Sequence, residues 1–174
     1  SPWPSRLENT MSITRHASQK APATEAPPSG TALLLVAHGV KGGPGIGAVH
    51  AAAMRRLGLF DEVAVACLKG EPGIGNTLRS LHSQDVVVLP LLMAQGYSYE
   101  TVLHDQLRDA SSGHRVALCD PLGADPALAE IASAMAIRTC RERSWSGDET
   151  TVTIVGHGTR QSIHSRASAV SLAD

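Results

Sequence analysis

Short apolar runs alternate with amphipathic stretches through the middle of the chain. The apolar runs predict four strands, at residues 32–37, 62–68, 85–90 and 115–119. Helical spacing of apolar residues predicts helices between and after them, at residues 46–57, 72–81, 99–107 and 126–135. Strands that alternate with helices in this way form βαβ units with right-handed crossovers. We therefore expect an α/β fold, a three-layer α/β/α domain with a four-stranded parallel sheet.

The two ends of the chain depart from this pattern. Residues 1–30 are rich in Ser, Pro, Ala and Thr and show no period, which predicts a disordered leader. Residues 31–143 are the predicted domain and residues 144–150 a polar linker. Residues 151–174 carry one further strand pattern and one helix pattern. Since a single strand–helix unit cannot bury its own faces, we expect either a truncated second repeat or a tail that docks on the domain or on a partner chain.

Two histidines occupy the same position in the repeated pattern. His38-Gly39 ends the first predicted strand, and His157-Gly158 follows the apolar run at residues 152–155. The second pair comes about 120 residues after the first, which is the size of one small domain. A neutral imidazole can bind a metal ion or accept a proton near pH 7. We expect one histidine at a strand tip in each repeat, either as a ligand and base or as a residue hydrogen-bonded to loop backbone.

Bulk composition excludes several classes of protein. A formal net charge of −1 argues against binding nucleic acid through phosphate neutralisation. No apolar run is long enough to span a bilayer, and the amino terminus lacks a secretory signal, so we expect no membrane partner. Three widely spaced cysteines predict free thiols in a reducing cytoplasm. Hydrophobic residues make up 43% of the chain but aromatic residues only 3%, so the core must be aliphatic.

A glycine-rich segment follows His38 and opens the first helix. Gly45 and Gly47 could help its amino terminus to receive an anionic group of a substrate. A dinucleotide-binding fold is the competing interpretation, and it requires an acidic residue at the end of the second strand. That strand ends in Cys67, Leu68 and Lys69. The dinucleotide interpretation is therefore disfavoured.

Two further segments follow strands at the same edge of the predicted sheet. Glu71 could bind a metal ion or take a proton, or it could stabilise the amino terminus of the second helix. The loop after the third strand is apolar and could form a wall for a flat hydrophobic ligand; its candidate contacts are Met93, Gly96, Tyr97 and Ser98. Glu100 and His104 have helical i, i+4 spacing, which could share a metal ion but favours a surface pair.

Several of these segments together resemble the class II tetrapyrrole chelatases, of the sirohydrochlorin cobaltochelatase and ferrochelatase type. The segments are Leu-Leu-Val-Ala-His-Gly at residues 34–39, Glu71-Pro72, the run from residue 86 to Tyr97, and residues 120–128. Residues 155–160, Val-Gly-His-Gly-Thr-Arg, are similar to the opening of the same family. The resemblance implies insertion of Co²⁺ or Fe²⁺ into a sirohydrochlorin-type tetrapyrrole, in cobalamin or siroheme biosynthesis. It implies no cofactor beyond the substrate metal ion, and a homodimer is a further expectation.

The resemblance also assigns roles to individual residues. It implies that His38 or His157 binds the metal ion and acts as a base, and that Glu71 assists as a third catalytic and metal-binding residue. One position departs from the family pattern, because Ser98 stands where the family usually has histidine. That departure supports an alternative, a non-catalytic homologue that binds metal or tetrapyrrole as a carrier, sensor or scaffold. It also leaves open that the active pair lies in the second repeat.

Overall fold

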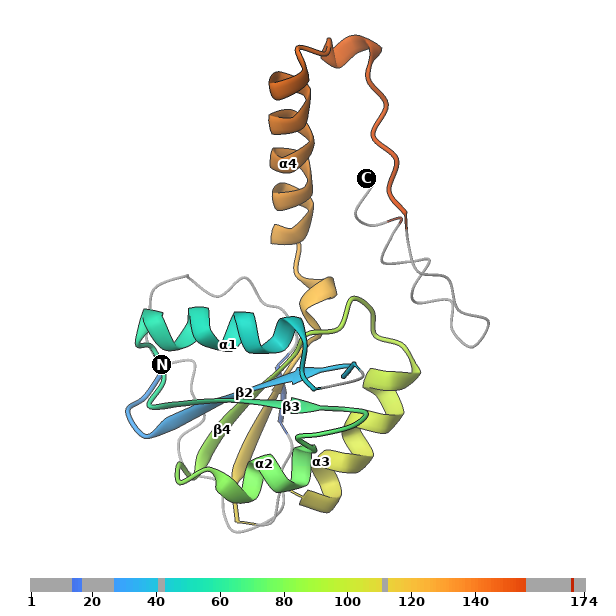
Figure 1. Ribbon diagram of the computed structural model, residues 1–174. Helices are drawn as coiled ribbons and strands as arrows, with labels where there is room; N and C mark the ends of the chain where they lie inside the picture. The colour runs from blue at the N-terminus through green and yellow to red at the C-terminus, as the bar shows by residue number, and fades with distance from the viewer. Residues whose placement is uncertain (1–13, 17–26, 41–42, 111–112, 156–169, 171–174) are drawn as a thin grey trace.

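The protein is an α/β domain with a parallel sheet, shown in Figure 1 as a computed structural model. The structure describes residues 14–16, 27–40, 43–110, 113–155 and 170. The strands are β1 (Thr14–His16), β2 (Thr31–Ala37), β3 (Glu62–Cys67), β4 (Asp85–Pro90) and β5 (Arg115–Cys119). The main helices are α1 (Ile46–Leu57), α2 (Ile74–Ser80), α3 (His104–Ala110) and α4 (Ala127–Arg143).

The sheet has the order β1-β5-β4-β2-β3, and every neighbouring pair is parallel. Strand β2 lies between β3 and β4, and its Leu33 pairs with Val63 on one side and Val87 on the other. The carboxyl ends of these three strands therefore lie at one edge of the sheet. The α/β fold and the four strands predicted between residues 31 and 119 are confirmed.

A fifth strand comes from the segment that the sequence predicted to be a disordered leader. Thr14–His16 pair in parallel with residues 117–119 of β5 and extend that side of the sheet. The composition of residues 1–30 gives no sign of this strand, because composition reports how much apolar surface a segment can bury. Backbone pairing to an open strand edge requires no apolar side chain. The leader interpretation is wrong for these three residues.

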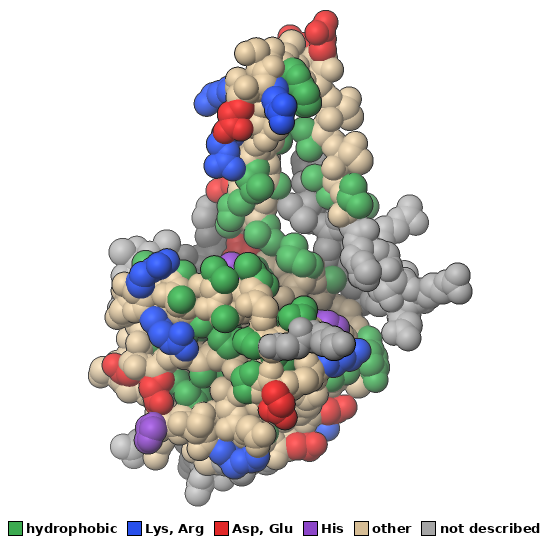
Figure 2. Space-filling model, in the orientation of Figure 1, with side chains coloured by type: hydrophobic (Ala, Val, Ile, Leu, Met, Phe, Trp, Pro, Cys, Tyr) green, Lys and Arg blue, Asp and Glu red, His purple; other side chains and the backbone are tan. Residues whose placement is uncertain are grey.

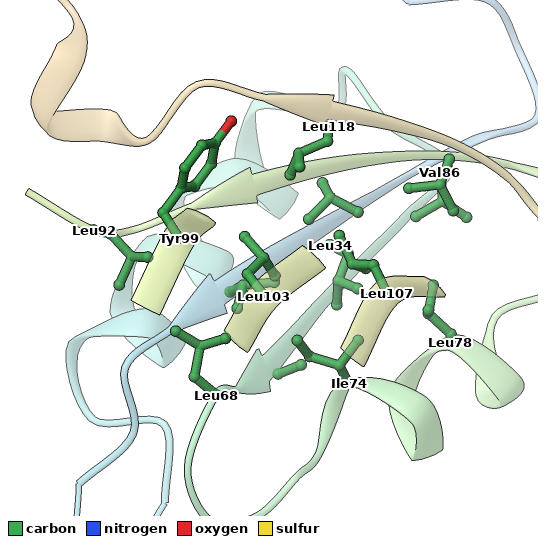
Figure 3. Close-up of a cluster of buried hydrophobic side chains, with 14 of the residues drawn as sticks. Leu34, Leu68, Ile74, Leu78, Val86, Leu92, Tyr99, Leu103, Leu107 and Leu118 are labelled. Carbon is green, nitrogen blue, oxygen red and sulfur yellow. The ribbon is translucent and has the colours of Figure 1, made fainter. Parts of the chain in front are cut away.

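One face of the sheet carries most of the core. Helices α2 and α3 cover this face, and Tyr99, Leu103 and Leu107 are fully buried there. Figure 3 shows these side chains packed against Leu34 of β2 and Leu118 of β5. The core is aliphatic apart from Tyr99, as the composition predicts.

Helix α1 packs on the other face, over β2 and β3. The boundaries of α1 match the prediction, and Gly58 ends it in the left-handed region at φ 63°. The side of α1 that faces the sheet is not the predicted one, because its buried residues are Gly47 and Ala51. Ile46, Val49 and Leu57, which carry the helical spacing, are each more than 60% exposed.

Helix α4 extends away from the domain (Figure 1), and none of its residues is buried. The predicted apolar stripe of this helix is present, but α4 does not form part of the domain core. Among the described residues, no helix is both long and apolar enough to cross a bilayer.

The second repeat predicted from the sequence begins without a strand. Residues 151–155 have no regular secondary structure, and Val155 is 88% exposed. In the described part of the chain these residues have no neighbouring strand, and an apolar run forms a strand only where another strand can pair with it. Most of the predicted helix near the carboxyl terminus lies outside the described residues.

Glu62 fixes the amino-terminal edge of the sheet, opposite to the candidate site. Its carboxylate accepts hydrogen bonds from the backbone N–H groups of His82 and Ser83 and from the Ser83 hydroxyl, at 2.7–3.0 Å. These bonds, led by the Ser83 hydroxyl, lower the pKa of Glu62 to about 2. The loop between α2 and β4 is thereby attached to the first residue of β3.

We expect Glu62→Gln to destabilise the domain at pH 7 by on the order of 1–2 kcal/mol, because an ionised acceptor of three hydrogen bonds is lost. The pKa of Glu62 is lowered on folding, so its contribution is complete above pH 4.5 and is lost as the pH falls toward 2. Urea unfolding at pH 7 and at pH 3.5 checks this. The difference in the free energy of unfolding between wild type and Glu62→Gln should be smaller at pH 3.5 than at pH 7. The control is Glu130→Gln, at an exposed position, which should change the free energy of unfolding little at either pH.

Candidate active site

His38 lies directly after the central strand, at the carboxyl edge of the sheet. Backbone pairing continues past the end of β2, since the N–H of Leu68 donates to Ala37 O at 2.9 Å and that of Lys69 donates to His38 O at 3.1 Å. The imidazole itself is exposed. The structure thus fixes the backbone of His38 and leaves its side chain open to solvent, at the edge where ligands bind in open α/β sheets.

The glycine after His38 is required by packing. Gly39 has φ 90°, and a β carbon there would lie 2.0 Å from the Lys69 carbonyl oxygen and 3.1 Å from Cys67 Cβ. Any side chain at this position would separate the loops that follow β2 and β3. The His-Gly pair is therefore explained by a close approach of two backbones, with glycine allowing the contact that positions His38.

The glycine-rich loop has two separate roles. Gly45 precedes α1 at φ 55°, which favours glycine. Gly47 is buried, and a β carbon there would meet Val65 Cγ1 at 3.0 Å and Ala37 Cβ at 3.2 Å. Its N–H already donates to Pro44 O at 3.0 Å. Gly47 therefore lets α1 approach the sheet, and its contact with substrate stays a prediction.

Glu71 follows β3 at the same edge, as predicted, and its side chain is exposed. Its Oε2 accepts a hydrogen bond from Gly73 N–H at 3.0 Å, just before α2. This contact matches the alternative that the sequence left open, in which Glu71 stabilises the start of that helix. A carboxylate accepts several bonds, so the second oxygen keeps acceptor capacity.

The cysteines at this edge are poor metal ligands at neutral pH. Cys67 is buried beside Glu71, and burial followed by the negative charge of Glu71 raises the pKa of its thiol. Burial and the neighbouring Asp120 likewise raise the pKa of Cys119. Thiolates are the form that binds metal. All three cysteines are free in the structure.

The apolar loop after β4 is braced against the segment that follows β5. Gly123 N–H donates to Leu92 O at 2.9 Å, and a β carbon at Gly123 would lie 2.1 Å from Met93 O. Gln95 Nε2 donates to Asp120 Oδ1 at 3.3 Å. These braces were not found from the sequence; the only available signal was a glycine two residues after Pro121. They hold the loop that carries Met93 and Tyr97 at the site.

Ser98 begins a π-helical turn, η1 (Ser98–Leu103), that leads into α3. The N–H groups of Tyr99 and Glu100 both donate to Gly96 O, at 2.8 and 2.9 Å. Tyr99 is fully buried, and its hydroxyl donates to Cys119 O at 3.3 Å. Insertions of this kind are frequent at functional sites. Ser98 itself is half-buried.

Four large apolar side chains are exposed at the carboxyl edge, and we call them the apolar rim. Its members are Val40 (63% exposed), Ile46 (64%), Met93 (56%) and Tyr97 (58%). Val40 and Ile46 flank the glycine-rich loop after β2, and Met93 and Tyr97 lie on the loop after β4. The rim therefore offers exposed apolar side chains on the loops that follow β2 and β4, two neighbouring strands of the sheet.

No preformed cation site is present in the described part of the chain, where no three His, Cys, Asp or Glu side chains converge. His38 and Glu71 follow neighbouring strands and share the sheet edge. His104 is half-buried, and its ring lies edge-on to the Tyr99 ring, with 5.5 Å between the ring centroids. It lies within the helix and does not take the position of Ser98. His157 lies outside the described residues. The edge thus supplies single donor side chains rather than a closed set of ligands.

Comparison with known proteins places the chain among chelatase-related sequences. The profile of the CbiX family matches residues 32–139. A protein of Halobacterium salinarum described as "Probable sirohydrochlorin cobaltochelatase" is 32% identical over 159 residues, which are 77% of this chain and 54% of that protein. The chain therefore spans about half the length of this curated relative. A solved CbiX protein from Marinobacter aquaeolei VT8 is 20% identical, with a TM-score of 0.49 over 65% of this chain and 98% of that one.

We expect Gly39→Ala to destabilise the domain far more than Gly70→Ala. Both glycines have φ near 90°, so alanine brings about 1–2 kcal/mol of backbone strain at either position. Only at position 39 does the new β carbon collide with backbone, which adds roughly 1–3 kcal/mol. Urea unfolding of both variants measures the difference. If both variants lost the same free energy of unfolding, the packing requirement at Gly39 would be contradicted.

Proposed function

Because this chain belongs to the CbiX family, we propose that it contributes the first half of a metal chelatase that inserts a divalent ion into a sirohydrochlorin-type tetrapyrrole. The observation that carries the proposal is the position of His38. An exposed imidazole on a fixed backbone lies at the carboxyl edge of the sheet, the edge that also carries the exposed residues of the apolar rim. The sequence resembles the class II chelatases, and the CbiX profile that matches residues 32–139 belongs to the same family.

The rim suits the shape and chemistry of a macrocycle. A tetrapyrrole has a flat apolar ring, and exposed Met, Ile, Val and Tyr side chains can contact such a ring over its face or edge. Removing these side chains from water stabilises binding by about 25 cal/mol per Å² of apolar surface. The braces from Gly123 and Asp120 keep the Met93–Tyr97 loop in place before the macrocycle binds.

Metal insertion requires an ion donor and an acceptor for protons. The macrocycle takes up M²⁺ and releases its two pyrrole protons. We assign His38 to hold the incoming ion, since imidazole suits Co²⁺ and Fe²⁺. Glu71, which follows the neighbouring strand, is assigned to receive one of the two protons with its second carboxylate oxygen, while the first keeps its hydrogen bond from the Gly73 N–H. The imidazole of His38, once it has passed on the ion, is assigned to receive the other proton. A site with few protein ligands releases the ion readily, as a transfer reaction demands.

The description of the Halobacterium salinarum relative supports Co²⁺ as the metal that is inserted. The family resemblance also implies a second possibility, insertion of Fe²⁺ for siroheme. Because the chain spans about half of that relative, we propose that the complete site includes a second half. Residues 155–158, Val-Gly-His-Gly, are similar to residues 36–39, Val-Ala-His-Gly, so His157 is the candidate ligand there.

A second function, a non-catalytic carrier or scaffold for metal or tetrapyrrole, is supported by one specific observation. Ser98 stands at the position where the family resemblance expects histidine, and no three-ligand cluster exists among the described residues. Such a protein would bind the macrocycle through the same rim and release no metallated product. Turnover separates the two functions.

In a protein that joins this chain to the proposed second half, we expect conversion of many equivalents of sirohydrochlorin with Co²⁺ under anaerobic conditions. There we expect His38→Ala to lower the rate by about 100-fold or more, the range for a positioned acid–base group. The absorbance of the macrocycle follows insertion against a reaction without protein. The matched control is His82→Ala, since His82 is exposed at the opposite edge of the sheet.

Each outcome assigns one of the functions. Turnover that falls with His38→Ala and not with His82→Ala supports a chelatase that uses His38. A spectral change that stops at one equivalent supports the carrier. Turnover that His38→Ala leaves unchanged would overturn the role of His38.

A further inference from the structure

The loop that follows β3 holds a lysine at a fixed place next to the backbone of His38. The Lys69 N–H donates to His38 O at 3.1 Å, and the Leu68 N–H donates to Ala37 O at 2.9 Å. The Leu68 carbonyl in turn accepts a hydrogen bond from Gln106 Nε2 of α3, at 3.1 Å. The backbone that carries Lys69 is therefore attached to β2 on one side and to α3 on the other.

The same loop is closed at its base. The Cys67 N–H donates to Pro72 O at 2.7 Å, and Cys67 also forms a parallel bridge with Gly73. Gly70 follows Lys69 with φ 91°, and a β carbon at Gly70 would meet no atom within 4 Å. The side chain of Lys69 is exposed. Lys69 thus lies at the tip of a short closed loop, with open space around the residue that follows it.

Lys69 brings an unpaired positive charge to an edge that is otherwise acidic. It is the only Lys or Arg in the described parts of the loops that follow β2, β3, β4 and β5, and no ion pair joins it to a described carboxylate. The acidic residues of these loops are Glu71, Asp120 and Asp125, and each already accepts a hydrogen bond from an N–H group. In Figure 2 a basic side chain and a histidine both reach the surface at the right-hand end of the domain, where β2 and β3 end in Figure 1.

We propose that Lys69 binds a carboxylate at the periphery of the macrocycle and so selects tetrapyrroles with acidic side chains. The inference rests on the proposed function, from which it takes the macrocycle. A sirohydrochlorin-type ring carries carboxylate groups around its edge. A ring held by the apolar rim brings such groups to the neighbouring loops, where the ammonium of Lys69 attracts them and the protein's own carboxylates repel them. A hydrogen bond between ammonium and carboxylate is among the stronger ones that a protein makes.

Lys69 is assigned to binding and orientation of the macrocycle, and it transfers no proton. Because its backbone is bonded to that of His38, a carboxylate held by Lys69 keeps one edge of the ring near the metal-binding residue. An interaction that is equally strong with the substrate and with the transition state lowers KM and leaves kcat unchanged. We therefore expect Lys69 to decide which macrocycle binds rather than how fast the ion enters it.

We expect Lys69→Gln to raise the dissociation constant of metal-free sirohydrochlorin by about tenfold, because a hydrogen bond to a charged group is lost. Absorbance titration of the macrocycle with the 174-residue chain measures this. Lys69→Arg keeps the positive charge, and its dissociation constant should stay within about twofold of wild type. The matched control is Arg56→Gln, which removes an exposed cation in the last turn of α1 and should leave binding unchanged.

A second macrocycle, with its carboxylates converted to neutral amides, separates the charge of Lys69 from any effect on the loop. We expect wild type and Lys69→Gln to bind this amide equally. Equal binding of the acidic macrocycle by wild type and Lys69→Gln would overturn the role of Lys69 and leave the chelatase proposal standing. A loss of affinity that is the same for the acid and the amide would also overturn it. If wild type bound neither macrocycle, the proposed function would fail, and this inference with it.

Discussion

The burial of β2 is the constraint on which the rest of the structure depends. All seven of its residues are buried, so every backbone N–H and C=O of the strand must find a partner within the protein. Parallel pairing with β3 and β4 supplies those partners on both sides. The pairing continues into the loops, where Leu68 and Lys69 bond to the end of β2 and Leu91 N–H bonds to Val36 O at 2.8 Å. The segments carrying Glu71 and Met93 are brought beside His38 as a consequence.

The two faces of the sheet differ in how completely helices cover them. The more completely covered face contributes most of the buried core, and the other leaves apolar side chains exposed. The face covered by α2 and α3 holds the fully buried core, including Tyr99, whose hydroxyl reaches the backbone of β5. The α1 face is thinner, and α1 approaches the sheet only because Gly47 has no side chain. Apolar residues therefore remain exposed on α1, on the rim and on α4, where a ligand or a second protein surface can cover them.

Sequence patterns predict the four strands between residues 31 and 119 well because each contains a continuous apolar run, which in three of them follows one charged residue. The runs at 85–90 and 115–119 coincide with β4 and β5 in the structure. The patterns do not predict β1, which depends on an open strand edge, nor the position of α4, whose apolar stripe looks the same whether or not it is packed. Residues 151–155 fail as a strand for want of a neighbouring strand.

The sequence predicts which edge of the sheet carries the candidate site. His38 and Glu71 lie where the pattern places them, since strand order fixes which loops meet. Gly47 packs against Val65, a role that was not predicted, because the sequence does not distinguish a glycine that approaches a ligand from one that approaches a strand. The π-helical turn after Ser98 and the brace from Gly123 arise from contacts between distant segments and have no local pattern.

The most direct test of this account is to locate the bound macrocycle by methyl NMR. Metal-free sirohydrochlorin would be titrated into the chain labelled at its methionine, isoleucine and valine methyl groups. The methyl signals of Met93, Ile46 and Val40, at the carboxyl edge, are expected to shift with one saturating dependence on the macrocycle concentration, while the signals of Val63 at the amino edge stay unchanged. Shifts centred on the amino edge, or on α4 alone, would contradict the placement of the site around His38.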